Sequence, residues 1–471
     1  MAGGARGPIV LVALVVVAYL PFIGGGFLTD DFVHLDRLSQ IRTVGDVVNA
    51  PDAFGFFRPV TQATLFIEAL IHPSTAPLFR LTNVVLQALV LMAAFGVSRL
   101  LLAPSATEGL PSVSAAALAT LIFALTPKAH PIAVLWISAR GELLMALFAL
   151  AATWGWIVWT RGGRRAWLMT ALVAYALATL SKETAFLLPL ALLVAPGSTI
   201  PWRRRLVAAS AMVAVAAVVF LWRLEAGALV PSTSDEHYML ATPLFRWWRN
   251  ARNYFGRLVP EPLMAVIFVA FFAAAERGWR TVASGFIRMW EQKRVLSGFR
   301  RTASVRETAL FAIAWMSVFL VPVLPVVARN ELYLYLPAFG LSLLAAQVIE
   351  SSVDLSRRSL HVWYAITIFA VAGGLYQASR SREMHDELVF SGKLVDSLAS
   401  TKGPGAILLI GEDGKTRQLL KDTIADYLPA VLRLAAPDGR LIAADSEQPD
   451  APGVIRVRCS YHDDRLVFAR N

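Results

Sequence analysis

Two adjacent carboxylates, Asp30 and Asp31, stand directly after the first apolar run of the chain, which covers residues 8–26. Phenylalanines flank the pair, at Phe27 and Phe32. Taking two charges out of water at the end of an apolar helix costs free energy, so packing alone does not explain them. We therefore predict that Asp30 and Asp31 take part in catalysis at a membrane surface. The alternative is that one acid caps a helix and the other is solvated.

Further ionisable and aromatic side chains occur in the short segments between apolar runs. They are Arg58, His130, Arg140, Glu142, Lys182, Glu183, Arg329, Glu331 and Tyr333. If these segments meet on one membrane face, they form a polar pocket that contains both acids and cations. A reaction at an anionic lipid headgroup needs a base for the incoming nucleophile and a cation for the leaving phosphate.

Six of these side chains also have a structural interpretation. Arg140 and Glu142 can form an ion pair at the end of a span. Lys182 and Glu183 can belong to a turn. Arg58 can anchor a loop, and Tyr333 can be an interfacial aromatic residue.

A divalent cation such as Mg²⁺ or Mn²⁺ is a further candidate component of the site. Asp30, Asp31 and Glu142 are its candidate ligands, and a metal ion would help a phosphate to leave. His34 and His130 lack the spacing typical of metal ligands, which makes a histidine site a weaker interpretation.

The composition is that of a membrane protein. Of 471 residues, 56% are hydrophobic and only 16% are charged, whereas soluble domains carry about a quarter charged residues. The net charge of +11 comes largely from basic residues in loops, where they set membrane orientation, so we expect no nucleic-acid partner. The single cysteine, Cys459, excludes an intramolecular disulfide.

Apolar runs predict about eleven membrane-spanning helices, because a span needs roughly 20 apolar residues. They cover residues 8–26, 79–103, 112–127, 142–160, 166–181, 184–198, 206–224, 261–275, 308–326, 333–350 and 360–378. Basic loops at 161–165, 203–205, 277–306 and 357–358 all lie on one side if the N-terminus is cytoplasmic. This orientation places the candidate site and the C-terminal tail outside. We predict a location in a bacterial inner or plasma membrane.

Two domains are expected. Residues 1–378 form the membrane domain, and 379–471 form a small extracytoplasmic α/β domain. In the latter, residues 406–410, 453–458 and 464–468 have the pattern of strands, and 381–400 and 416–434 that of helices. Outside the membrane, residues 245–255 alternate arginine and asparagine with aromatic residues, which is typical of an interfacial helix or of an aromatic belt.

Four motifs carry a family resemblance. They are His130-Pro131 followed by Trp136-Ile137-Ser138-Ala139-Arg140-Gly141-Glu142-Leu143-Leu144; Ser181-Lys182-Glu183-Thr184; Phe57-Arg58-Pro59-Val60 with Leu81-Thr82-Asn83; and Leu332-Tyr333-Leu334-Tyr335-Leu336-Pro337. Together, and in their order along the chain, they resemble the transmembrane, tetratricopeptide-repeat O-mannosyltransferases and their bacterial relatives. Arg80 and Leu332 replace a histidine and an arginine of that pattern, and the repeats are absent.

The resemblance implies a C-type (GT-C) glycosyltransferase fold and a polyprenyl-phosphate-linked sugar donor. It also implies that an aspartate at the start of the first outer loop is the base, the place held here by Asp30 and Asp31. The acceptor would be a hydroxyl of an extracytoplasmic protein or glycan, and the sugar would be transferred with inversion. Two other hypotheses stay open: a lipid-linked sugar transporter, and an inactive lipid-binding scaffold. A transporter needs charges at several depths of its spans.

Overall fold

Long apolar helices make up most of the structure, which is a computed structural model. It describes residues 6–72, 75–102, 115–125, 129–228, 240, 243–258, 293–295, 302–327, 329–352, 360–400, 406–411, 414–423, 440–444, 454–462 and 465–470. The predicted span 261–275 lies outside these residues. The predicted helical fold is confirmed.

Among the described residues, five helices are long and apolar enough to cross a membrane. Two of them are α5 (Ala76–Leu101) and α11 (Trp202–Glu225). The other three are Ile137–Gly162, which includes α8 (Arg140–Gly162); Val305–Val323, which includes α15 (Val305–Leu320); and Glu331–Ile349, which includes most of α16 (Tyr335–Ser352). Helices α6 (Ala115–Leu125) and α7 (Ala129–Leu135) make a sixth span if this pair, bent by 72°, is counted as one. The predicted count of about eleven is therefore not confirmed.

Shorter helices fill the spaces between the long ones. They are α1 (Arg6–Tyr19), η1 (Leu20–Phe22), α2 (Asp30–Gln40), α3 (Val44–Asn49), α4 (Pro59–Ile71), η2 (Ile137–Ala139), α9 (Arg165–Ser181), η3 (Glu183–Leu187), α10 (Leu188–Leu193), α12 (Leu244–Leu258), η5 (Val321–Val323) and η6 (Glu331–Leu334). The basic turn after α8 is closed by Gly163, whose φ of +68° is a backbone conformation that glycine adopts without steric cost.

The core of the bundle is formed where α8 packs against α5 and α9, and where α16 packs against α6 and α15. Of the apolar stretch that includes α16, 78% is buried inside the protein, against 22% of the apolar stretch in α11. Helix α11 therefore presents most of its apolar surface outward, as a lipid-facing helix does, while α16 is central.

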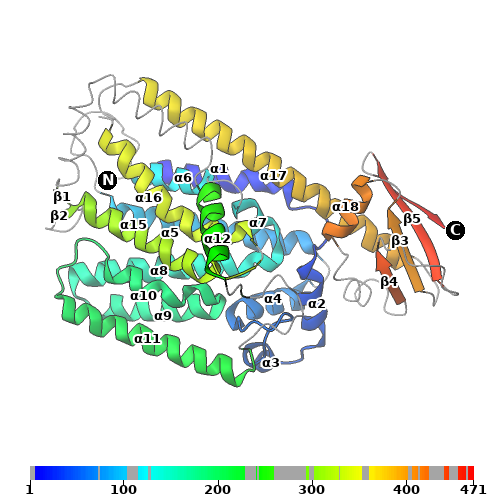
Figure 1. Ribbon diagram of the computed structural model, residues 1–471, viewed down its shortest axis with the longest axis horizontal. Helices are drawn as coiled ribbons and strands as arrows, with labels where there is room; N and C mark the ends of the chain where they lie inside the picture. The colour runs from blue at the N-terminus through cyan, green and yellow to red at the C-terminus, as the bar shows by residue number, and fades with distance from the viewer. Residues whose placement is uncertain are drawn as a thin grey trace.

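The elements that carry the candidate site gather at one end of the bundle. Figure 1 shows α2, α3 and α4 at the end nearest the C-terminal strands, and the hairpin of β1 (Lys293–Val295) and β2 (Thr302–Ser304) at the opposite end. Helix α12 runs across the long helices instead of along them (Figure 1) and contacts α16 and η6. The predicted helix at 245–255 is thereby confirmed; its place at a membrane interface stays a prediction.

The C-terminal part begins with α17 (Leu360–Ser400), which continues through the predicted boundary at residue 378. It is followed by β3 (Ala406–Gly411), α18 (Gly414–Thr423), β4 (Arg440–Ala444), β5 (Val454–His462) and β6 (Arg465–Arg470). The strand order is β4-β3-β5-β6, with β3 parallel to both neighbours and β5 antiparallel to β6. The division into two domains stays a prediction.

Candidate active site

The two aspartates are the first residues of α2, and Thr29 is the N-cap residue before them. Neither aspartate is the cap itself, so the capping alternative does not apply. Acids in the first turn interact favourably with the positive end of the helix dipole. Helix α2 buries Phe32, Leu35 and Leu38 and packs against α4 and η2, which turns Asp31 inward.

Asp31 is held by three hydrogen bonds and is only 1% exposed. Its Oδ1 accepts from the backbone N of Ser138 at 2.8 Å and from the Ser138 hydroxyl at 2.5 Å. Its Oδ2 accepts from the backbone N of Leu28 at 3.1 Å. Burial raises the pKa of Asp31, and the Ser138 and Leu28 donors and the nearby Arg80 charge oppose that rise.

Arg80 is a site component to which the sequence assigned no role. It is fully buried in α5, where Nε donates to the Leu135 carbonyl at 3.0 Å. Nη1 donates to the Ile23 carbonyl at 3.0 Å, and Nη2 donates to that of Gly26. Arg80 thus fixes the turn that leads into α2, and its charge lies within electrostatic range of Asp31.

Arg140 is also fully buried, and its partner is an acid that the sequence analysis did not single out. Nη1 lies 2.5 Å from Oε2 of Glu68 on α4. Nε donates to Asn83 Oδ1 and Nη2 to the Phe79 carbonyl, both at 2.9 Å. The alternative of an Arg140–Glu142 ion pair is therefore wrong. The available signal was that Glu68 is an acid inside an otherwise apolar helix.

Glu142 pairs with Lys182 instead, across the interface between α8 and the end of α9. The two side chains are only 4% and 8% exposed. The Lys182 ammonium also lies 5.2 Å from the centre of the Tyr333 ring, which is a cation–π contact. Three predicted site residues, Glu142, Lys182 and Tyr333, are thus brought together.

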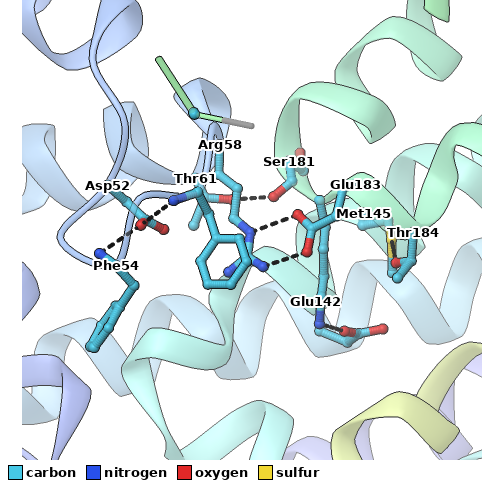
Figure 2. Close-up of polar contacts among 12 residues, drawn as sticks. Asp52, Phe54, Arg58, Thr61, Glu142, Met145, Ser181, Glu183 and Thr184 are labelled. Carbon is cyan, nitrogen blue, oxygen red and sulfur yellow. Dashed lines mark hydrogen bonds and ion pairs between the residues drawn. The ribbon is translucent and has the colours of Figure 1, made fainter. Parts of the chain in front are cut away.

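Arg58 and Glu183 form a second pair, joined by two hydrogen bonds. Arg58 Nε donates to Oε2 at 3.0 Å and Nη2 to Oε1 at 2.7 Å, as Figure 2 shows. Burial by itself raises the pKa of Glu183, but the Arg58 charge and its hydrogen bonds outweigh this and lower the pKa to about 2. Next to this pair, Thr61 Oγ1 donates to the Ser181 carbonyl at 2.9 Å, which ties α4 to the end of α9 (Figure 2).

His130 lies deeper, in an aromatic and amide environment. Its Nδ1 is 2.9 Å from Gln87 Nε2, and the Tyr335 hydroxyl donates to Gln87 Oε1. Its ring is 4.6 Å from the ring of Tyr335. The described contacts of His130 connect α5, α6, α7 and α16, and none of them is with the two aspartates.

The remaining predicted residues lie around η6. Glu331 Oε1 is 3.2 Å from Arg257 Nη1, which links η6 to α12. Arg329 is exposed and precedes η6. Arg329 therefore lies at the exposed rim of the residues around η6, while Glu331 joins η6 to α12.

The divalent cation stays a prediction, and two of its three candidate ligands, Asp31 and Glu142, already have protein partners. Both Asp31 oxygens already accept hydrogen bonds, and Glu142 pairs with Lys182. Within the described ranges, no group of three or more His, Cys, Asp or Glu side chains is placed to hold a metal ion. We derive no step through a metal.

Apolar helices that carry buried acid–cation pairs at one end indicate a membrane protein, and its fold is similar to that of a solved C-type (GT-C) glycosyltransferase. The structure of ArnT from Cupriavidus metallidurans bound to undecaprenyl phosphate matches 98% of this chain and 94% of its own, with a TM-score of 0.50 and 14% identity. An oligosaccharyltransferase from Archaeoglobus fulgidus matches 93% of this chain and 62% of its own, with a TM-score of 0.45 and 13% identity.

At the sequence level, a protein O-mannosyl-transferase of Caenorhabditis elegans is 26% identical over 161 residues. The matched region is 32% of this chain and 22% of the length of that relative. No protein-family model matches the chain.

Proposed function

We propose that the chain is an integral membrane glycosyltransferase that moves a sugar from a polyprenyl-phosphate-linked donor to an acceptor hydroxyl outside the cytoplasm. The fold supports the general class, as does the local identity to a protein O-mannosyl-transferase. The bound undecaprenyl phosphate of the ArnT structure supports the class of donor. A protein or a glycan would be the acceptor.

The observation that carries the proposal is the placement of Asp31. Each carboxylate oxygen has about two lone-pair sites. The two Ser138 donors fill those of Oδ1, whereas Oδ2 accepts one bond, from Leu28. Oδ2 therefore keeps a site for a proton. A buried carboxylate whose pKa is raised is also a stronger base than an exposed one.

In the proposed reaction, Asp31 takes the proton of the acceptor hydroxyl while the hydroxyl oxygen forms a bond to the anomeric carbon. The bond from that carbon to the phosphate oxygen breaks, and the polyprenyl phosphate leaves with the electron pair. Attack from the face opposite to the phosphate inverts the configuration. Asp30, one residue earlier, is the second candidate for the base.

Lys182 is the cation that we propose for the leaving phosphate. An ammonium group has three donors, and one of them serves Glu142. Arg329 at the rim is the second candidate. Arg140 and Arg58 hold Glu68 and Glu183, so we assign them the support of α4 and η3 around the site.

The test compares Asp31→Asn, Asp30→Asn and the double variant in a strain that lacks the native protein. Glycans and glycoproteins are analysed by mass spectrometry, and membrane insertion is checked for each variant. Loss of a general base predicts a fall in transfer of about 10²- to 10⁴-fold for Asp31→Asn. Glu225→Gln, an exposed acid at the end of α11, is the matched control and should transfer normally. Normal transfer by the double variant, or uptake of labelled lipid-linked sugar into vesicles without transfer, contradicts the proposal.

A further inference from the structure

The turn that leads into the two aspartates is bound by the C-terminal helices, more than 350 residues away along the chain. The backbone N of Gly26 donates to the Leu388 carbonyl of α17 at 2.7 Å. The Ser391 hydroxyl of α17 donates to the Phe27 carbonyl at 2.5 Å. The backbone N of Thr29 donates to the carbonyl of Thr423, the last residue of α18, at 3.1 Å.

Thr29 has a strained backbone directly before Asp30. Its φ of 39° makes it the non-glycine residue with positive φ in the described part of the chain. Such a conformation persists where surrounding contacts hold it, and it is enriched at functional sites. Two hydrogen bonds hold this conformation: the N–H of Thr29 donates to the Thr423 carbonyl of α18, and the N–H of Leu28 donates to the Asp31 carboxylate.

Glycines allow α17 to approach this turn closely. A Cβ added to Gly26 would lie 2.6 Å from the Cα of Gly392, and one added to Gly25 would lie 2.6 Å from the carbonyl carbon of Leu388. A Cβ on Gly392 itself would lie 3.0 Å from the Gly26 nitrogen. On its other side the turn is held by the Arg80 guanidinium. The turn is therefore clamped between α5 and α17.

Beside this contact, a cavity of about 680 Å³ separates α17 from the start of α2 and α5. Its lining includes Phe27, Phe32 and Leu35 on one side and Val389 and Val395 on the other. Because the cavity separates the side chains of α17 from those of α2 here, the glycine contact and the three hydrogen bonds connect α17 and α18 to the turn.

We propose that α17 and α18 position the aspartates, with Gly392 and Ser391 as positioning residues that act through residues 25–29. The role in catalysis rests on the proposed function. The Asp31 carboxylate is hydrogen-bonded to Ser138 of η2, whereas the backbone that leads to Asp31 belongs to the turn. A displacement of the turn by α17 therefore pulls on Asp31 and changes the distance between its carboxylate and the acceptor hydroxyl. The C-terminal part is thereby a component of the catalytic apparatus.

The experiment uses full-length protein in detergent and compares Gly392→Ala with Gly374→Ala. Both glycines lie in α17, but a Cβ on Gly374 meets no atom within 4 Å. Hydrogen–deuterium exchange of peptides covering residues 23–32 reports directly on the N–H groups of Gly26 and Thr29. We expect faster exchange in Gly392→Ala and wild-type exchange in Gly374→Ala. A misplacement of the base predicts a fall in kcat of about tenfold to 100-fold with an unchanged KM for the donor.

The outcomes separate the two proposals. If the wild type transfers sugar and Gly392→Ala equals Gly374→Ala in exchange and kcat, the positioning role is refuted and the proposed function stands. If the wild type transfers no sugar while exchange still distinguishes the variants, the proposed function fails and the clamp stands. Where Gly392→Ala does not fold, Ser391→Ala replaces it, because it removes only the donor to the Phe27 carbonyl. Unchanged exchange in Ser391→Ala refutes the clamp.

Discussion

The ion pair between Arg140 and Glu68 allows a quantitative test of the interior of the site. In Glu68→Gln, the fully buried Arg140 guanidinium loses its carboxylate partner and keeps only neutral acceptors, among them Asn83 Oδ1 and the Phe79 carbonyl. An arginine cannot release its proton to escape burial. Breaking a buried pair in this way costs about 3–5 kcal/mol of unfolding free energy, and we expect a value in this range.

The reverse change should cost less. In Arg140→Met, the Glu68 carboxylate keeps the Thr82 hydroxyl as a donor at 2.6 Å, and a buried carboxylate can be neutralised by a proton. We expect a cost of about 1–3 kcal/mol. In Glu68→Leu combined with Arg140→Met no charge is left buried, so the double variant should be more stable than Glu68→Gln, although Asn83 loses a partner.

Equilibrium unfolding in mixed micelles near neutral pH, followed by tryptophan fluorescence, measures these differences. Glu331→Gln is the control, because the Arg257–Glu331 pair is 32% and 22% exposed and such pairs contribute about 0–1 kcal/mol. A cost for Glu68→Gln no larger than that of the control would refute the reasoning. So would a double variant whose cost equals the sum of the costs of Glu68→Leu and Arg140→Met measured singly, because it would mean that the two residues act independently.

Three further predictions address the site and the bilayer. Ser138→Ala removes one donor to the charged form of Asp31, so its pKa rises further and the acid limb of the pH–kcat/KM profile moves to higher pH; an unmoved limb argues against Asp31 as the base. Glu183 has a pKa of about 2 in the folded protein, below its unfolded value, so the stability that it contributes is present above about pH 5 and is lost as the pH falls. The difference in unfolding free energy between wild type and Arg58→Gln should therefore shrink as the pH falls. A constant difference contradicts the Arg58–Glu183 pairing. Trp248 on α12 is 72% exposed, and its fluorescence should be quenched by brominated lipids in nanodiscs. Trp248→Phe should therefore lose quenching that Trp156→Phe, which removes a buried tryptophan, retains. Equal quenching in both variants places α12 away from the bilayer.

The sequence predicted the class of fold and the segments that carry the site. Long apolar runs can only be buried or face lipid, and the charged residues between them must therefore collect at the ends of helices. This reasoning identified the acids at the start of α2 and the ionisable residues near Ser181 and at η6. It gave too little information on the number of spans, because short apolar helices such as α9 and α10 resemble spans in composition without reaching their length.

The partners within the site depended on tertiary structure. Arg140 contacts Glu68 and not Glu142, Lys182 contacts Glu142, and Arg58 contacts Glu183. These residues are 40 to 125 positions apart, and any cation in these segments is chemically able to pair with any acid. The packing of α4, α8 and α9 selects among the combinations.

Asp30 and Asp31 at the start of α2 show the same division. Their residue types and their place after an apolar run are properties of the sequence, and both indicate chemistry at the membrane surface. Their geometry is not: Ser138 is 107 positions away and Thr423 is nearly 400 positions away, and both contact residues 29–31 only because η2 and α18 fold back onto the start of α2. Contacts of such sequence separation leave no local pattern, so only the folded chain specifies them.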